Sequence, residues 1–387
     1  MADNNENKVL NVPLLRFPEF TEEWKEHCLA EYLDFKNGLN PSANKFGSGI
    51  KFISVMDILN NNFITYDCIR TSVKITPEEQ VAFAVEKGDM LFQRSSETLE
   101  DVGRANVYMD ENPAVFGGFV IRGKKKTEYN PMFFRYLLAS PYARKKIIPM
   151  GAGAQHFNIG QDGLSKVKLH FPILQEQQKI AALLRLIDER ITTQNKIIED
   201  LNKLKSAISE CIFNSIKGDV VMLSEICDIV KGKQINGEYL SESGEYYVMN
   251  GGTEPSGYYS EYNVKANTIS ISEGGNSCGY VQFNNFPFWS GGHCYSLQNI
   301  ADIVDNLYLY HYLKSKEEAI MKLRIGSGLP NIQKKDLAMF KTIVPPFEQQ
   351  ITISTFLSSL ERKAEIEERI LNVMQKQKLY LLQQMFI

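Results

Sequence analysis

The chain has 387 residues, of which 43% are hydrophobic and 23% charged, and its formal net charge at pH 7 is −3. This length predicts two or more domains, the composition is that of a globular protein, and the acidic balance lacks the basic excess usual in nucleic-acid binders. No run approaches the ~20 apolar residues of a membrane-spanning helix, and the polar first residues lack the apolar core of a secretory signal, so we expect a cytoplasmic protein with no membrane partner.

Residues 1–11 predict a disordered N-terminus, and residues 12–171 predict a first globular domain. In this domain Trp24, Leu29, Leu33 and Phe35 indicate a short helix that leads into a strand. Strand patterning between turn-forming clusters follows at 50–55, 63–68, 81–93 and 104–109. An apolar helix is then predicted over 130–140, with a glycine-rich loop at 151–159. The domain therefore mixes α and β elements.

Residues 172–217 predict one long helix. Its apolar residues recur at a spacing near 3.5, which is typical of a coiled-coil seam: Ile180, Leu184, Ile187, Ile191, Ile198, Leu201, Ile208 and Ile212. Pro172 suits the entry to a helix, and Gly218 suits its end. A helix of about 40 residues would be about 60 Å long.

The second half of the chain repeats the first. Residues 345–386 align with 172–213 without a gap at an offset of 173 (345 − 172). Between them, strand patterning recurs at 245–250, 267–272 and 279–284, and an apolar helix recurs at 305–315. A self-match of this kind indicates a duplicated architecture. We therefore predict a second globular domain over 218–344 and a second long helix over 345–387.

The predicted fold is thus α/β (mixed α+β), with a pseudo-two-fold internal repeat. Two homologous globular domains are joined by two long helices that form an antiparallel coiled coil. Both seams carry a polar residue at the same position of the repeat, Gln194 and Glu367 (367 − 194 = 173). Two interpretations stay open: the pair faces each other and sets the register, or both side chains are solvated on a loosened seam.

No catalytic motif is found in the sequence. There is no G-x-S-x-G elbow and no H-E-x-x-H pair, and the near match to a phosphate-binding loop at 118–125 has Lys125 in place of the hydroxyl residue. Cys278, His293 and Cys294 could be imagined as metal ligands, but adjacent His293 and Cys294 have poor chelate spacing. We expect no catalytic residue and no metal site in this chain.

Polar side chains on the predicted loops are the remaining candidates for function. Arg, Gln and Asn read base edges in the major groove of DNA, while Lys, Ser and Tyr mostly hold phosphates, although lysines are also common as plain solvated surface. In the first domain the candidate DNA-binding residues are Lys45, Lys51, Gln93, Arg94, Ser95, Ser96 and Arg104. In the second domain they are Lys231, Lys233, Gln234, Asn236, Asn250, Tyr258, Asn276 and Ser277.

The duplicated segments PILQEQQKIAALL (172–184) and PPFEQQITISTFL (345–357), together with RFPEFTEEWKEHCLAEY (16–32), carry a resemblance over nearly the whole chain. The sequence resembles the specificity subunit of type I restriction-modification systems. The resemblance implies a non-catalytic protein in which two target-recognition domains each read one half of a bipartite, asymmetric site in double-stranded DNA. It also implies that the helices dock two N6-adenine methyltransferase (modification) subunits, and that restriction subunits, which are ATP-driven translocases, join this core. S-adenosylmethionine, ATP and magnesium would then belong to the partner subunits.

Two alternatives remain at this point. The chain could serve a methylation-only complex without restriction subunits, or it could be a coiled-coil scaffold that joins two protein-binding domains without nucleic acid. The bases that are recognised and the length of the spacer between half-sites cannot be read from loop residues alone.

Overall fold

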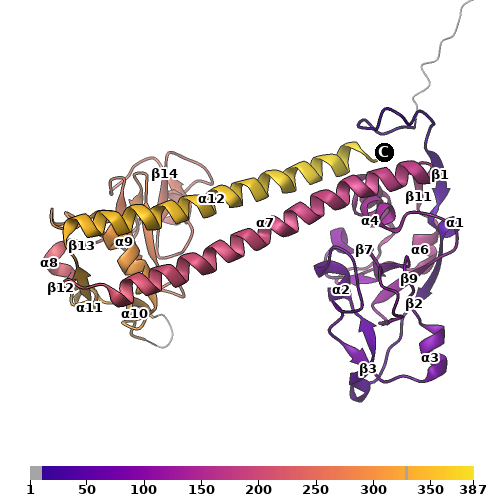
Figure 1. Ribbon diagram of the computed structural model, residues 1–387, viewed down its shortest axis with the longest axis horizontal. Coiled ribbons are helices and arrows are strands. Elements are labelled where there is room, and N and C mark those ends of the chain that lie inside the picture. Colours follow the sequence, from indigo (N-terminus) through magenta and orange to yellow (C-terminus); the bar gives the residue numbers. More distant parts are fainter. Residues whose placement is uncertain (1–10, 327–329) are drawn as a thin grey trace, which may run out of the picture. The chain divides into compact units, whose positions relative to one another are not determined.

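The computed structural model describes residues 11–326 and 330–387, which form two compact units (Figure 1). Unit 1 comprises the described residues up to Gln194 together with Ile370–Ile387, and unit 2 comprises Asn195–Arg369. The predicted disorder of residues 1–11 falls outside the described part except at Asn11, whose carbonyl accepts a hydrogen bond from the Trp24 N–H at 2.9 Å. Over the described residues, none of the helices combines the length and the apolar character that crossing a bilayer requires.

Unit 1 is built on a four-stranded antiparallel sheet. Its strands, in spatial order, are β2 (Leu33–Asn37), β9 (Val120–Lys125), β5 (Met90–Gln93) and β7 (Ala105–Val107). A second sheet has the order β4 (Ser72–Val73), β3 (Phe46–Ile53) and β8 (Val115–Phe116), and β3 runs parallel to β8. Two antiparallel pairs complete the strands: β1 (Lys25–Cys28) with β11 (Lys168–Phe171), and β6 (Ser95–Ser96) with β10 (Phe157–Asn158).

Short helices pack around this sheet, and α4 contributes three buried aromatic side chains to the core. They are α1 (Leu29–Tyr32), α2 (Val55–Asn60), α3 (Pro77–Ala82), α4 (Pro131–Ala139), α5 (Pro141–Ile147) and α6 (Gln161–Ser165). The helix predicted over 130–140 is α4, which begins at Pro131 behind an Asn130 cap and buries Phe133 and Phe134. The end of the chain joins this core, because the ring of Phe386 lies 6.3 Å from Trp24 and 5.7 Å from Phe133.

Unit 2 repeats this topology. Its four-stranded antiparallel sheet has the order β13 (Asp228–Lys231), β19 (Cys294–Gln298), β16 (Thr268–Ser272) and β17 (Val281–Asn284). Its second sheet has the order β15 (Tyr258–Tyr259), β14 (Tyr246–Met249) and β18 (Trp289–Ser290), again with one parallel pair, and β12 (Asp219–Met222) pairs with β20 (Lys341–Val344). Helices α8 (Leu223–Ile226), α9 (Asn306–Ser315), α10 (Glu317–Met321) and α11 (Lys334–Ala338) follow the order of α1, α4, α5 and α6. The predicted duplication is confirmed for the two larger sheets and for the β1-β11 pair, whereas the β6-β10 pair has only the isolated bridge between Gly274 and Asn331 as its counterpart.

One of the predicted strands is wrong, and another is confirmed only in its last part, where residues 90–93 form β5. The segment 63–68 is a turn in which only Ile64 forms a bridge, to Tyr108, and the first part of 81–93 belongs to α3. Helix α3 forms because Thr76 Oγ1 accepts from the Glu79 N–H at 3.2 Å, the Glu79 carboxylate accepts from the Thr76 N–H at 3.0 Å, and Pro77 stands at the first helical position. This reciprocal capping box outweighs the apolar alternation that favoured a strand.

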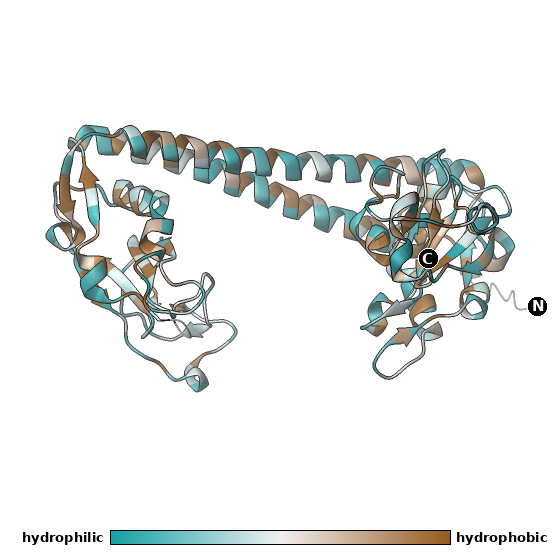
Figure 2. Cartoon of the chain, turned by 90° about the horizontal axis from the view of Figure 1, so that it is seen from below, coloured by the Kyte–Doolittle hydropathy of each residue, from teal (hydrophilic) through white to brown (hydrophobic). Residues whose placement is uncertain are grey.

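The two long helices are confirmed as α7 (Leu174–Ser215) and α12 (Phe347–Gln384). At 1.5 Å per residue, the 42 residues of α7 extend for about 63 Å. Figure 2 shows hydrophilic and hydrophobic residues mixed along both helices, as expected for helices that bury only a narrow seam.

The same ion pair joins α7 to α12 in each unit. In unit 1 the Asp188 carboxylate lies 2.5 Å from Lys378 Nζ, and in unit 2 Lys205 Nζ lies 3.6 Å from the Glu361 carboxylate. The residue numbers have the same sum (188 + 378 = 205 + 361 = 566), so the helices are antiparallel, as predicted. The two pairs are also related by the repeat, because 361 − 188 and 378 − 205 both equal 173. The suggested meeting of Gln194 and Glu367 stays a prediction, since these residues belong to different units.

The duplicated segments Gln175-Glu176-Gln177 and Glu348-Gln349-Gln350 at the helix starts have a structural role. The Gln177 side chain accepts from the Asn130 N–H at 3.0 Å and donates to the Pro172 carbonyl at 3.0 Å. Gln350 makes the equivalent contacts with the Asp305 N–H and the Pro345 carbonyl, both at 2.8 Å. Each buried glutamine therefore ties the start of a long helix to the first turn of α4 or α9.

Candidate nucleic-acid interface

The ends of the central strands form the same backbone framework in both units. In unit 1 the Arg94 N–H donates to the Phe119 carbonyl at 2.8 Å, and the Arg94 carbonyl accepts from the Ile159 N–H at 2.9 Å. In unit 2 the Glu273 N–H donates to the His293 carbonyl at 2.9 Å, and the Glu273 carbonyl accepts from the Ile332 N–H at 2.8 Å. Arg94 and Glu273 are therefore equivalent positions, each directly after a central strand (β5 or β16).

A glycine pair lies beside each of these positions because a neighbouring amide side chain needs the space. A Cβ atom added to Gly118 would lie 1.9 Å from Asn40 Oδ1, and one added to Gly292 would lie 2.4 Å from Gln234 Oε1. Asn40 and Gln234 are equivalent, since the offset between them is the 194 that also relates Gly38 to Gly232. The framework thus holds an amide against a side-chain-free backbone in both units.

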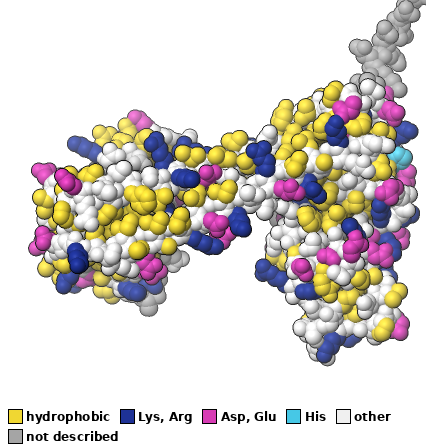
Figure 3. Space-filling view, in the orientation of Figure 1, with side chains coloured by type: hydrophobic (Ala, Val, Ile, Leu, Met, Phe, Trp, Pro, Cys, Tyr) yellow, Lys and Arg dark blue, Asp and Glu magenta, His cyan; other side chains and the backbone are white. Residues whose placement is uncertain are grey.

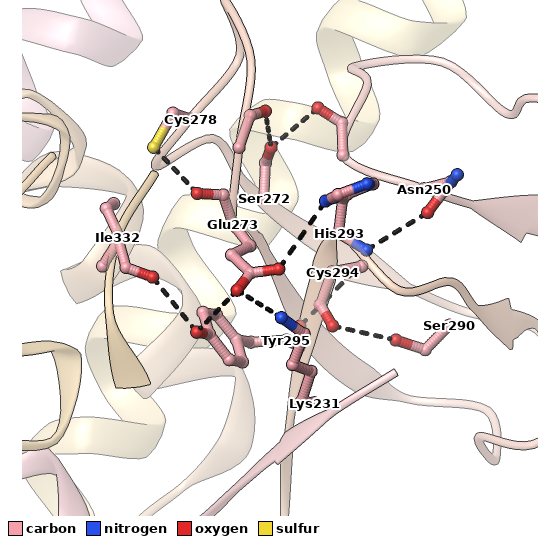
Figure 4. A network of polar contacts seen from close by, with 12 residues as sticks. Lys231, Asn250, Ser272, Glu273, Cys278, Ser290, His293, Cys294, Tyr295 and Ile332 are labelled. Atoms are coloured by element: carbon pink, nitrogen blue, oxygen red, sulfur yellow. Dashed lines mark hydrogen bonds and ion pairs between the residues drawn. The ribbon is translucent and has the colours of Figure 1, made fainter. Parts of the chain in front are cut away.

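In unit 2 a buried carboxylate organises the strand ends (Figure 4). Glu273 is 7% exposed, and its Oε1 accepts a hydrogen bond from Lys231 Nζ at 2.6 Å and lies 3.2 Å from the Tyr295 hydroxyl. His293 Nδ1 lies 3.8 Å from Oε2, which has no hydrogen-bond partner within the described part of the chain. The Lys231 and His293 side chains are 53% and 63% exposed. Glu273 therefore holds a cation and an imidazole that both face solvent.

The environment of Glu273 favours this arrangement. Burial, and the charge of Glu273 after it, raise the pKa of the Tyr295 phenol, so that this group stays a neutral donor. His293 is also fixed through its backbone, because its N–H donates to Asn250 Oδ1 at 3.2 Å. A carboxylate at this depth needs a cation and a hydrogen-bond donor, and both are present.

In unit 1 a guanidinium stands where unit 2 has the carboxylate. Arg94 is half-buried, and its Nη1 donates to the Gly118 carbonyl at 3.3 Å. The next residue, Ser95, donates from Oγ to Asn158 Oδ1 of the glycine-rich loop, so that the loop lies along β6. Phe119, at the position equivalent to His293, is 67% exposed. The two units therefore present different chemistry on one backbone framework.

The structure brings some of the predicted site residues together and places others elsewhere. Residues at the strand ends or on the adjoining loops are Gln93, Arg94, Ser95, Lys231, Lys233, Gln234, Asn250, Asn276 and Ser277. Among them Gln93 is only 5% exposed and donates to the Ser95 carbonyl, while Lys233 accepts at its carbonyl from the Trp289 indole at 2.9 Å.

The remaining predicted residues have local partners. Lys51 donates to the Ile69 carbonyl at 2.7 Å, Ser96 is buried, and Arg104 pairs with Asp101 at 2.6 Å. Asn236 caps the 3₁₀ turn Gly237–Tyr239, Tyr258 lies in β15, and Lys45 ends the 3₁₀ turn Ala43–Lys45. The other 3₁₀ turns are Leu99–Asp101 and Ile148–Met150. These contacts define where each side chain lies and leave its role in DNA binding a prediction.

Sequence reasoning missed Glu273, Tyr295, Asn40, Phe119 and Asn158, and weighed His293 only as a metal ligand. No three His, Cys, Asp or Glu side chains gather as a cation site anywhere in residues 11–326 and 330–387. Cys278 donates to the Glu273 carbonyl at 3.0 Å, and burial raises the pKa of the Cys294 thiol to about 11. The signal that could have found the missed residues is the repeat itself, which aligns Glu273 with Arg94.

The comparisons of this sequence with known proteins all indicate one family. A sequence model described as the type I restriction modification DNA specificity domain matches residues 21–203 and again 217–376. The putative type I restriction enzyme MjaX specificity subunit of Methanocaldococcus jannaschii is 24% identical over 389 residues, covering 91% of this chain and 90% of that protein. A putative type I specificity subunit of Mycoplasma pneumoniae is 33% identical over 156 residues, covering 40% of this chain and 41% of that protein.

Solved structures are similar in fold. The crystal structure of a type I restriction-modification system S subunit from M. genitalium superimposes with a TM-score of 0.65 at 18% identity, covering 97% of this chain and 99% of that one. A chain from a study of complex assembly and conformational transition of the type I R-M system gives a TM-score of 0.60 at 16% identity, covering 93% and 96%.

Proposed function

The chain belongs to the family of type I restriction-modification DNA specificity subunits, with two target-recognition domains, and we propose that it reads a bipartite, asymmetric site in double-stranded DNA without catalysing any reaction itself. The observation that carries the asymmetry is the pair Arg94 and Glu273. One framework of backbone hydrogen bonds presents a cation in one domain and a buried carboxylate in the other. Two domains with such different side chains are suited to two different half-sites.

The long helices are the proposed docking surface for two methyltransferase subunits. Hydrophobic side chains remain at the surface of α12 (Figure 3), including Ile366 at 47%, Val373 at 64% and Tyr380 at 56% exposure. Ile197 of α7 and Ile370 of α12 are equivalent by the repeat and are exposed at 40% and 38%. Exposed apolar side chains of this kind are typical of protein interfaces, and the repeat supplies two similar sites.

The partner subunits are also the proposed source of the chemistry. S-adenosylmethionine would bind to the methyltransferase subunits, and ATP with magnesium to restriction subunits, in the cytoplasm. The net charge of −3 supports this division, because a weakly acidic chain gains little affinity from phosphates and needs basic partners to hold the duplex.

Sequencing of methylated adenines in a host that expresses this chain with its methyltransferase partner tests the proposal. We expect a gapped motif of two unlike half-sites that disappears when this chain is deleted. An ungapped motif, or methylation that persists after the deletion, would contradict it. A restriction assay with unmethylated phage DNA then separates a complete complex from a methylation-only complex.

A further inference from the structure

We infer that Arg94 in unit 1 and Lys231 in unit 2 each read a guanine, and that Glu273 is the positioning residue for Lys231. This inference rests on the proposed function, and it assigns a base to each half-site. The two cations occupy different places on the shared framework. Arg94 follows β5, whereas Lys231 ends β13, the strand equivalent to β2.

The hydrogen bond of Arg94 orients its guanidinium and leaves most of its N–H donors unused. One Nη1 bond to the Gly118 carbonyl, at 3.3 Å, fixes the direction of the group. Throughout the described residues no carboxylate lies within ion-pair distance of this side chain, whereas the exposed Arg104 is paired with Asp101 at 2.6 Å. A guanidinium has five N–H donors in a planar fork, so a parallel pair stays available for the O6 and N7 acceptors of guanine.

The contacts of Lys231 point to base reading rather than phosphate binding. Its ammonium lies 2.6 Å from a carboxylate that is 7% exposed, so its charge is largely neutralised and it attracts phosphate only weakly. The same contact removes the rotational freedom of a long side chain and leaves its other N–H donors with a fixed direction. Directed donors are what recognition of a base edge requires, while a phosphate contact needs mainly charge.

Glu273 can hold this position because its own place is fixed. Its backbone N–H and carbonyl are both engaged, and Tyr295 approaches the oxygen that Lys231 uses. Figure 4 shows Lys231, at the end of β13, and His293, in the turn before β19, both approaching the carboxylate. In unit 1 the residue equivalent to Lys231 is Asn37, so that domain has no cation at this place and uses the Arg94 position instead.

The test uses the full chain reconstituted with its methyltransferase partner and a DNA library randomised in both half-sites. The variants are Arg94→Ala, Lys231→Ala and Glu273→Gln. Lys87→Ala and Lys265→Ala are controls that remove one exposed positive charge from unit 1 and unit 2. Sequencing of the bound fraction gives the preference at every base pair.

We expect Arg94→Ala to reduce discrimination about 5- to 150-fold at one G·C pair of one half-site, which is the range for a single base contact. Lys231→Ala should do the same at one G·C pair of the other half-site. Glu273→Gln should relax that same pair, and it should add nothing when combined with Lys231→Ala, because it acts through Lys231. The controls should leave all base preferences unchanged.

Three results would overturn the inference: an equal loss of affinity on every sequence, a change in both half-sites from one variant, or a Glu273→Gln effect at a base pair that Lys231→Ala leaves untouched. Lys231→Ala leaves the buried Glu273 carboxylate without its cation and lowers stability, whereas Glu273→Gln keeps the shape of the native side chain and removes the buried charge, so this variant and the double variant keep unit 2 folded. A wild-type complex without a bipartite motif would refute the proposed function itself, before any variant is compared.

Discussion

The repeat-related carboxylates Asp188 and Glu361 should contribute very differently to stability. Asp188 is 5% exposed, accepts a hydrogen bond from the Tyr136 hydroxyl at 2.8 Å, and lies between Lys378 at 2.5 Å and Arg135 at 3.6 Å. Glu361 has a side chain that is 26% exposed, accepts a longer hydrogen bond from the Tyr310 hydroxyl at 3.3 Å, and lies 3.6 Å from Lys205, whose side chain is 33% exposed. The same position of the repeat is therefore buried in one unit and partly solvated in the other.

Asp188→Asn leaves two cations facing a neutral amide. Burial already lowers the pKa of Arg135, which shows how strongly this guanidinium is desolvated. Removing one partner from a buried charge cluster costs about 3–5 kcal/mol of unfolding free energy. Glu361→Gln removes a longer, wetter ion pair, and water replaces much of what is lost, so about 1 kcal/mol or less is expected.

The two tryptophans make this comparison measurable, because Trp24 lies in unit 1 and Trp289 in unit 2. Urea unfolding followed by fluorescence in a Trp289→Phe background reports on unit 1, and in a Trp24→Phe background on unit 2. Asp188→Asn should lower the first transition strongly, while Glu361→Gln should barely move the second. Equal losses for the two variants would refute the argument that burial sets the strength of this repeated ion pair.

Three further predictions follow from the helices. Gln177→Ala and Gln350→Ala should each lower the unfolding free energy by about 2–4 kcal/mol, because each leaves a buried backbone N–H and a carbonyl without a hydrogen-bond partner. The control Gln349→Ala changes an exposed neighbour and should cost under about 0.5 kcal/mol. Burial lowers the pKa of His311 to about 4. Below pH 6.5 the histidine is therefore protonated in the unfolded chain and stays neutral in the folded chain, so the unfolding free energy should fall by about 2 kcal/mol by pH 5. Seven residues inserted at mid-helix in both α7 and α12 preserve the seam and add about 10 Å to each helix, so the DNA spacer should lengthen while both half-sites stay the same.

Each of these has a result that would count against it. Gln349→Ala costing as much as Gln350→Ala would mean that the buried amide bonds are not what holds the helix start. For His311, thermal unfolding of the wild type is compared with His311→Gln from pH 7.5 to 5, and parallel curves would deny the linkage, because contributions of other groups cancel in the difference. A methylation motif with an unchanged spacer after the paired insertions would show that helix length does not set the distance between half-sites.

The sequence was informative where local rules decide the structure. The long helices align at a constant offset of 173, because an insertion in a packed helix would rotate every later residue out of the seam, whereas loops absorb insertions freely. The apolar pattern over 130–140 predicted α4, and Asn130 and Pro131 give this helix a local start signal of the same kind. Helix α2 was missed although Ser54 and Asp57 form a capping box, with the Asp57 carboxylate 2.8 Å from the Ser54 N–H.

The site could be predicted only in part, since its contacts join segments distant in sequence. Lys231 was chosen as an exposed loop cation, but nothing local shows that it meets Glu273, 42 residues away. Glu273 itself has the appearance of a solvated loop acid, and only the sheet order β13-β19-β16 buries it. Likewise, the packing of Phe386 against Trp24 depends on the return of α12 to unit 1, which no local pattern encodes.

Backbone atoms alone form the hydrogen bonds of the framework at the strand ends, so different side chains are compatible with the same fold. Some of these side chains must nevertheless change together with a neighbour. Arginine at position 94 needs only a carbonyl and water around it. Glutamate at the equivalent position 273 is desolvated, and without Lys231 it would leave a buried charge unpaired, at a cost of several kcal/mol. An acid at this position therefore requires a cation at the end of the neighbouring strand. Positions 273 and 231 are therefore coupled, and a change of DNA specificity at this place should replace both residues together.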